Sequence, residues 1–195
     1  MNQQYTTSIT KEKISSLPVE TFSGQIIVVD QPEMVGSAIA HLSSSGAVGF
    51  DTETRPNFSK KQHHIVSLVQ ISLDDVCYLF RLNRLGGIPQ QLIDFFVNKD
   101  VMKIGLSLQD DFLALRKHIR VEPVNFVDLQ KLVPSYGIKD ISLQKIYAIL
   151  FDKKISKRAR LSNWEADVLT DAQKQYAALD AWACLHIYQF LKLSE

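Results

Sequence analysis

The chain has 195 residues, 46% of them hydrophobic, which suffices to bury the core of one domain without disulfides or a structural metal. Its formal net charge is +1. This excludes a long-range basic field as the main means of holding nucleic acid, although it allows a local basic patch beside an acidic site. Cys77 and Cys184 lie in apolar stretches and are interpreted as small buried hydrophobic residues, which excludes a disulfide framework.

The lengths of the apolar runs bear on where the protein resides. No run reaches the ~20 residues of a membrane span, and the polar N-terminus lacks the apolar segment of a secretory signal. We therefore expect a soluble, cytoplasmic protein with no membrane partner. Residues 1–22 are polar and predict an N-terminal arm, either packed on the domain or frayed, and residues 23–195 predict one folded domain.

The hydrophobic pattern predicts strands and helices that follow one another regularly from Gln25 onward. An early run of strands is followed by strands that alternate with helices, which is typical of an α/β fold with a mixed sheet flanked by helices. Strands are predicted over 25–30, 47–53, 65–73, 76–82, 102–108 and 124–129, and helices over 32–46, 89–98, 110–119, 142–151 and 170–193.

Two carboxylates end the strand predicted over 47–53. Side chains two residues apart on a strand point to the same face, so Asp51 and Glu53 project together while Phe50 and Thr52 face the other way. Paired carboxylate oxygens suit hard divalent cations such as Mg²⁺ or Mn²⁺. Alone, such a pair is common after an apolar run and more often marks a solvated strand end.

The last predicted helix carries Tyr176 and Asp180, four residues apart and therefore on one side of the helix. The rest of this stretch is strongly apolar and is expected to pack into the core. A carboxylate buried there is costly unless it is paired or bound to a metal ion. Asp180 is thus either a metal ligand or a partly buried residue bonded to neighbouring backbone, and Tyr176 either acts with it or serves in packing.

These motifs, taken in order, resemble those of the DEDD superfamily of 3′–5′ exonucleases. The superfamily pattern is F-D-x-E, then an Asp heading a helix, then Y-x-x-x-D on a late helix. The tyrosine is typical of the subgroup that holds RNase D and the exonuclease domain of the Werner syndrome helicase. The stretches 125–129 and 161–188 resemble the Werner-type domain in particular, and the likeness covers about residues 25–192. It implies an RNase H-like, DnaQ-like fold.

The second motif falls on either Asp110 or Asp111. Placing it on Asp111 keeps the spacing to Asn125 and Asp128 that family members show, without a gap. Asp110 is then interpreted as a helix N-cap or first-turn acid, which the helix dipole favours. Asp128 is expected to make a structural hydrogen bond at the end of its strand.

The resemblance implies a two-metal hydrolysis of phosphodiester bonds from DNA or RNA 3′ ends, with release of 5′-nucleoside monophosphates. Asp51 would bridge two Mg²⁺ or Mn²⁺ ions, Glu53 and Asp180 would complete one site, and Asp111 would hold the second ion. Tyr176 would orient the attacking water. The Werner-like stretches favour DNA over RNA, and no protein partner is evident.

Substrate contacts are predicted in two polar segments. The loop after the first motif offers Arg55 for a phosphate and Phe58 for stacking on a base, unless Phe58 serves in local packing. The basic segment before the last helix offers Lys157, Arg158 and Arg160, which are equally compatible with a solvated loop.

Two other functions compete with the exonuclease. A catalytically silent module on the same fold would bind nucleic acid or protein, but such relatives usually lose a carboxylate, and all four stand here. An RNase H-like endonuclease is disfavoured by the tyrosine four residues before the last carboxylate.

Overall fold

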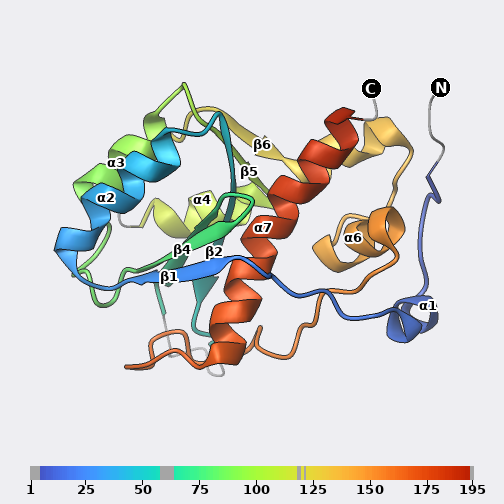
Figure 1. The fold of residues 1–195 in the computed structure, drawn as a ribbon, viewed down its shortest axis with the longest axis horizontal. Helices are drawn as coiled ribbons and strands as arrows, with labels where there is room; N and C mark the ends of the chain where they lie inside the picture. The colour runs from blue at the N-terminus through green and yellow to red at the C-terminus, as the bar shows by residue number, and fades with distance from the viewer. Residues whose placement is uncertain (1–4, 58–63, 118–119, 121, 194–195) are drawn as a thin grey trace.

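The computed structural model describes residues 5–57, 64–117, 120 and 122–193. A six-stranded sheet with the order β1-β4-β3-β2-β5-β6 forms its centre (Figure 1). The strands are β1 (Gln25–Val29), β2 (Ala47–Thr54), β3 (Val66–Ser72), β4 (Val76–Arg81), β5 (Met102–Gly105) and β6 (Phe126–Asp128).

The sheet is mixed, as predicted. Strands β2, β3 and β4 form an antiparallel meander, and β1 lies parallel to β4. Strands β5 and β6 extend the other edge in parallel, β5 beside β2 and β6 beside β5. All residues of β3 and β4 are buried, because both strands lie inside the sheet and helices cover it.

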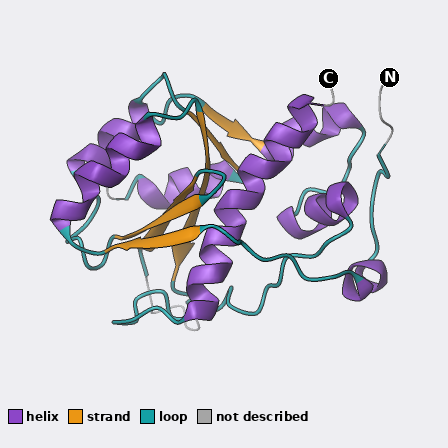
Figure 2. Cartoon of the chain, in the orientation of Figure 1, coloured by secondary structure: helices purple, strands orange, loops and turns teal. Residues whose placement is uncertain are grey.

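Helices cover both faces of the sheet and enclose two apolar cores (Figure 2). On one face the long α7 (Asp171–Leu193) crosses the strands, accompanied by α6 (Leu143–Phe151). On the other face lie α2 (Pro32–Ser43), α3 (Gln90–Val97) and α4 (Leu108–Leu115). The short helices α5 (Leu129–Leu132) and η1 (Val133–Tyr136) follow β6. The predicted layering, a mixed sheet flanked by helices, is confirmed.

The boundary between β5 and α4 differs from the prediction of a strand over 102–108 followed by a helix from 110. The strand ends at Gly105 and the helix already begins at Leu108. Ser107 causes the change, because its left-handed backbone (φ 61°) stops the strand and turns the chain into the helix. The sequence pattern missed this because Leu106 and Leu108 continue the apolar alternation of the strand. The helix also ends earlier than predicted, at Leu115, and residues 118–119 of the predicted helix lie outside the described residues.

The described part of the N-terminal arm, residues 5–22, packs on the domain. It contains a short helix that the sequence pattern did not predict, α1 (Lys11–Ser16). Ile14, Leu17 and Phe22 are buried, and Val19 forms an isolated parallel bridge with Lys154. Apolar residues spaced through a polar segment therefore anchor it, and of the two alternatives the packed arm is the one that the structure shows.

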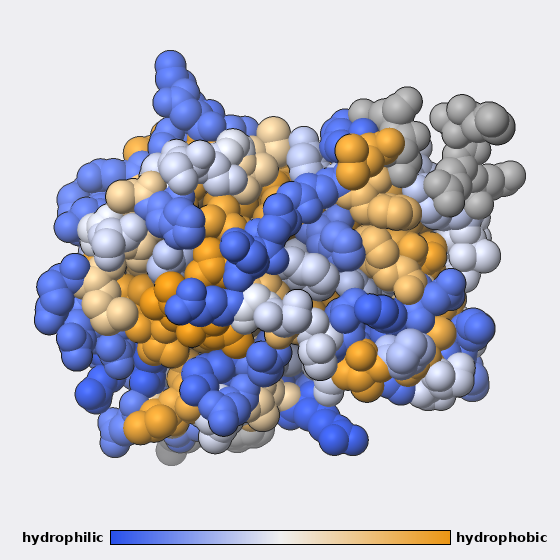
Figure 3. All heavy atoms as spheres, in the orientation of Figure 1, coloured by the Kyte–Doolittle hydropathy of each residue, from blue (hydrophilic) through white to orange (hydrophobic). Residues whose placement is uncertain are grey.

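Both cysteines are buried and unpaired with one another, as predicted. No helix in the described part of the chain combines the length and the apolar character that crossing a bilayer requires. On the face shown in Figure 3, hydrophilic residues are spread over the surface with apolar patches between them, rather than gathered in one region.

Candidate active site

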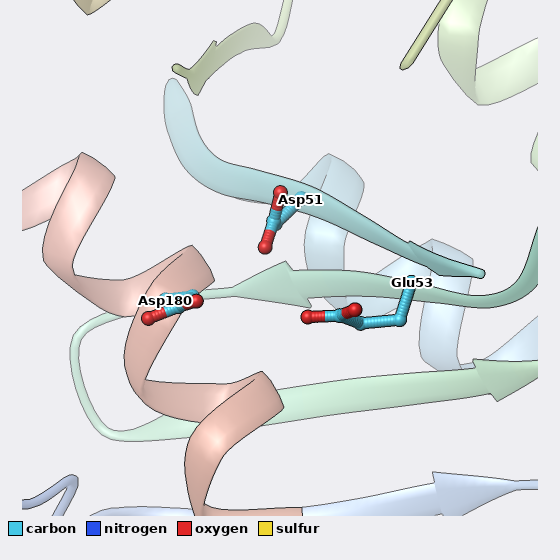
Figure 4. A group of neighbouring side chains, drawn as sticks. All are labelled: Asp51, Glu53 and Asp180. Carbon is cyan, nitrogen blue, oxygen red and sulfur yellow. The ribbon is translucent and has the colours of Figure 1, made fainter. Parts of the chain in front are cut away.

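Three carboxylates meet between β2 and α7. Asp51 and Glu53 project from one face of β2, and Asp180 projects toward them from α7 (Figure 4). One oxygen atom from each carboxylate lies within 4.8 Å of the other two. Phe50, directly before Asp51, points to the opposite face and enters the core on the α2 and α3 side. The predicted strand geometry and the i, i+4 helix geometry thus bring together groups from distant parts of the chain.

Small residues on α7 let this helix lie close to the sheet. Ala177, Ala178, Ala181 and Ala183 are almost fully buried in the core that α7 shares with the sheet. Asp180 stands among them and is only 7% exposed. A charged group this deep requires compensation, and one of its oxygens, Oδ1, has no hydrogen-bond partner among the described residues.

Asp111 is not one of the three mutually close carboxylates, but it lies near enough for its charge to raise the pKa of Asp51 and of Glu53. It lies in the first turn of α4, and its Oδ1 accepts a hydrogen bond from the Thr52 hydroxyl. Asp110 points elsewhere, and its Oδ2 accepts from the hydroxyl of Ser107, which is the N-cap residue, at 3.0 Å. The two adjacent acids therefore have different partners: Asp111 bonds to Thr52 on β2, whereas Asp110 bonds to Ser107 at the start of its own helix.

Asp128 holds the start of α4 in place. Its carboxylate accepts hydrogen bonds from the backbone amides of Ser107 (3.1 Å), Leu108 (3.2 Å) and Gln130 (2.9 Å). The structural hydrogen bond expected of Asp128 is thus present. It fixes the turn from which Asp111 projects.

The acidic cluster is electrostatically strained. Burial, with the nearby Asp111, Glu53 and Asp180, raises the pKa of Asp51 well above its usual value. Burial, with the nearby Asp180 and Asp111, raises the pKa of Glu53 to about 9. Burial raises the pKa of Asp111 to about 7. These shifts mean that ionised carboxylates repel one another here unless a cation offsets their charge.

The cluster fits divalent cations on the chemistry of its donors. It offers hard carboxylate oxygens from two elements, and Asp180 Oδ1 is buried without a partner in the described part of the chain. Burial raises the pKa of Asp180 to about 7, although the Tyr176 hydroxyl, Lys157 and Arg160 lower it. A bound cation would satisfy the orphaned oxygen and keep the carboxylates ionised.

Tyr176 lies one turn before Asp180 and borders the cluster. Its ring packs against the buried Trp164, with 6.0 Å between ring centroids. Burial and the carboxylates of Asp180 and Glu53 raise its pKa far above the ordinary value for tyrosine. Tyr176 is therefore a neutral phenol over the whole physiological range, able to donate one hydrogen bond and accept others.

The basic residues of the segment before α7 that are predicted to contact the substrate line two different cavities, and Tyr176 borders both. Lys157 and Arg160 line a cavity of about 360 Å³ together with Tyr176 and Asp180. Arg158 instead lines a second cavity of about 560 Å³, between the N-terminal arm and the first turns of α7. Two of the three predicted basic residues thus share a cavity with Asp180, and the third lines a different cavity, which Tyr176 also borders.

The loop after β2 is tied to the segment before α7. Arg55 forms an ion pair with Glu165 at 3.2 Å, and His64 contacts the same carboxylate at 2.8 Å. Arg55 keeps a side-chain exposure of 40%, so its guanidinium remains accessible. Phe58, the predicted stacking residue, lies outside the described residues. Neither Thr52 nor Glu165 stood out in the sequence, because only the folded chain brings their partners to them.

A model of the 3'-5' exonuclease family matches residues 26–194. The chain is 31% identical over 186 residues to the mouse bifunctional 3'-5' exonuclease/ATP-dependent helicase WRN, covering 90% of this chain and 13% of that protein. It is 35% identical over 154 residues to a 3'-5' exonuclease of Arabidopsis thaliana, covering 74% of this chain and 52% of that protein. The chain thus spans about half or less of these relatives.

Solved structures agree on the fold. The Nibbler EXO domain of Aedes aegypti superposes with a TM-score of 0.81 at 22% identity, over 90% of this chain and 92% of that one. Escherichia coli RNase D gives 0.74 at 18% identity, over 88% and 45%. The family match and this RNase H-like fold confirm the resemblance drawn from the motifs: the chain belongs to the 3′–5′ exonuclease family.

Proposed function

We propose that this protein is a metal-dependent 3′–5′ exonuclease that hydrolyses phosphodiester bonds at nucleic acid 3′ ends and releases 5′-nucleoside monophosphates. The observation that carries the proposal is the convergence of Asp51, Glu53 and Asp180 within 4.8 Å, with a buried oxygen on Asp180 that no described residue satisfies. Burying three mutually repelling carboxylates destabilises the protein. A metal-dependent active site explains this arrangement, whereas a catalytically silent binding module does not.

In this proposal Asp51, Glu53 and Asp180 hold the tighter cation site, and Asp51 and Asp111 hold the second. Two Mg²⁺ or Mn²⁺ ions there would supply an activated water and neutralise charge on the leaving oxygen. The two sites share β2, since Asp51 projects from it and Thr52, the next residue, binds Asp111. The strand thereby sets the spacing of both sites.

Tyr176 orients the attacking water in this proposal. Its pKa is raised far above the ordinary value by burial and by the carboxylates of Asp180 and Glu53, so it does not ionise to act as a base. A neutral hydroxyl one helical turn from Asp180 instead holds a water by hydrogen bonding. The packing of Trp164 against its ring limits the positions it can take.

Positive charge beside the acids would hold the substrate backbone. Lys157 and Arg160 line the cavity that Tyr176 and Asp180 share, and both lower the pKa of Asp180, so their charges act at the cluster. Arg55 remains accessible beside the first motif and is proposed as a further phosphate contact.

We infer DNA as the preferred substrate from the Werner-like stretches at 125–129 and 161–188. RNA belongs in the test, because one structural relative is an RNase D of Trypanosoma brucei in complex with RNA U12. That structure is 21% identical to this chain and has a TM-score of 0.75.

The test uses 5′-end-labelled single-stranded, duplex and recessed-end DNA, and RNA of the same sequence, with Mg²⁺, Mn²⁺ or EDTA. The expected result is stepwise shortening from the 3′ end that EDTA abolishes. Asp51→Asn should lack this activity and keep its circular dichroism spectrum. Cleavage in EDTA, cuts in a circular substrate or full activity of Asp51→Asn would each contradict the proposal. Substrate binding without cleavage under every condition would favour the silent module.

A further inference from the structure

Gln70 is a buried polar residue in the middle of the sheet. It lies in β3, between β2 and β4, and its register partners are Asp51 on β2 and Leu79 on β4. Its exposed fraction is 0%. Both polar atoms of its side chain, Oε1 and Nε2, are buried and have no hydrogen-bond partner among the residues that the structure describes. A buried amide whose donors and acceptor are unmet needs an explanation.

Gln70 lies on the same face of the sheet as the carboxylates. In an antiparallel pair, directly opposite residues share a face, with Cβ atoms about 4.5–5.5 Å apart. Asp51 is directly opposite Gln70, and Glu53 is opposite Leu68, two residues earlier on β3. Leu68 and Leu79 belong to the core that α7 covers, whereas Val69 and Ile71 belong to the core on the other face. The amide therefore lies under α7, beside the acidic cluster.

Packing alone does not account for an amide at this position. Its neighbours on that face, Leu68 and Leu79, are apolar and fully buried. A methionine would fill nearly the same volume without the cost of desolvating an unpartnered amide. The amide thus lowers the stability of the metal-free protein, and a benefit in another state would offset this.

The amide of Gln70 offers a hydrogen-bond donor, and the nearby carboxylates offer acceptors. Asp180 Oδ1 also lacks a partner in the described part of the chain, and Asp51 is surrounded by carboxylates rather than by positive groups. A carboxylate that binds a cation with one lone pair keeps other lone pairs free, and these are commonly held by a neighbouring donor that sets the orientation of the ligand. The Nε2 group of Gln70 supplies such a donor without adding charge.

We propose that Gln70 is a positioning residue for the metal site: its side-chain amide donates a hydrogen bond to the Asp51 carboxylate when that carboxylate holds a divalent cation. This rests on the proposed function only in assuming that the cluster binds cations. Gln70 acts through Asp51 and does not touch the substrate. It fixes the carboxylate that the two cation sites share.

The test compares wild type, Gln70→Met and the control Leu68→Met, which changes packing on the same face without removing a polar group. Mn²⁺ binding is measured by calorimetry, and thermal unfolding is followed in EDTA. Gln70→Met should unfold in EDTA at the wild-type temperature or higher, and should bind Mn²⁺ about tenfold more weakly. Leu68→Met should bind Mn²⁺ as wild type does. A Gln70→Met variant with wild-type Mn²⁺ affinity would overturn the proposal.

A second measurement does not depend on folding of the variant. In a crystal of the wild-type protein grown with Mn²⁺, Gln70 Nε2 should lie about 2.7–3.2 Å from an Asp51 oxygen. An amide bonded to Asp180 instead, or still unpartnered, would overturn the proposal. Mn²⁺ binding that weakens in Gln70→Met while no nucleic acid is cleaved would contradict the proposed function and leave the role of Gln70 standing. A wild type that binds no Mn²⁺ would overturn both.

Discussion

Gly49 on β2 lies directly against the backbone of Ala181 on α7: a Cβ at position 49 would stand 1.9 Å from the Ala181 carbonyl oxygen. Gly49 shares its face of β2 with Asp51, and Ala181 follows Asp180. The absence of a side chain at one position therefore allows the close approach that brings carboxylates from the two elements together.

Gly49→Ala should destabilise the protein by about 1–3 kcal/mol, because the added methyl group meets backbone that cannot move without shifting α7. It should also weaken Mn²⁺ binding, since Asp180 would move away from Asp51. Gly36→Ala is the matched control: nothing lies within 4 Å of its added Cβ, and it lies exposed in α2. The control should gain about 0.5–1 kcal/mol. Urea unfolding and calorimetry measure both effects, and equal stability of the two variants would contradict this account.

Asp111→Asn should reduce exonuclease activity by at least about a hundredfold, because it removes the charge of a proposed cation ligand. Asp110→Asn should retain activity near wild type and lose only a fraction of a kcal/mol of stability, since Asp110 contacts Ser107 at the exposed start of α4. Single-turnover rates on one DNA substrate compare the two. The reverse order of activities would place the second motif on Asp110.

Tyr176→Phe should lower kcat more than it raises KM, because in the proposed mechanism the lost hydroxyl orients water and does not hold the substrate. Tyr188→Phe, three turns further along α7, is the control and should match wild type. Steady-state kinetics on a labelled oligonucleotide give both constants. Equal loss in kcat and in substrate affinity would instead make Tyr176 a packing residue against Trp164.

The metal-free protein should lose stability as the pH rises. The folded-state pKa of Glu53, about 9, lies above its ordinary value of 4.5 because of burial and the nearby Asp180 and Asp111. Its favourable contribution is present below pH 4.5 and is lost as the pH rises through about 9. Asp180 and Asp111, with pKa values raised to about 7, act in the same direction at lower pH.

Thermal unfolding in EDTA between pH 5 and pH 9 measures this loss. Glu53→Gln should flatten the profile, and saturating Mn²⁺ should raise the wild-type unfolding temperature most at high pH, where the carboxylates are ionised. A metal-free unfolding temperature that rises from pH 5 to pH 9 would contradict the electrostatic strain inferred for the cluster.

Replacing Lys157 and Arg160 together by Gln should weaken DNA binding and reduce its salt dependence. Each lost phosphate contact lowers the log–log slope by about 0.7 for a single strand. Lys99→Gln is the control, because this exposed lysine lies three residues before the start of β5, at the end of the sheet away from the carboxylates. Measuring DNA binding in an Asp51→Asn background at several salt concentrations avoids cleavage. An unchanged salt dependence would mean that Lys157 and Arg160 are solvated and do not contact DNA.

Local sequence patterns by themselves determined much of this protein. The period of two in β2 placed Asp51 and Glu53 on one face, and the period of 3.6 in α7 placed Tyr176 beside Asp180, because backbone geometry repeats within one element. The order of these motifs also indicated the family. The two geometric inferences need only neighbours along the chain, and the family needs only the order of the motifs.

Only the tertiary structure decided which elements meet. No local pattern shows that Thr52 binds Asp111, that Gly49 receives the carbonyl of Ala181, or that Gln70 lies opposite Asp51 with its amide unpartnered among the described residues. The end of β5 was likewise set by the left-handed backbone of Ser107 and by Asp128, a residue 21 positions away. These contacts join distant segments, so their geometry depends on the packing of the whole sheet and not on the sequence around any one residue.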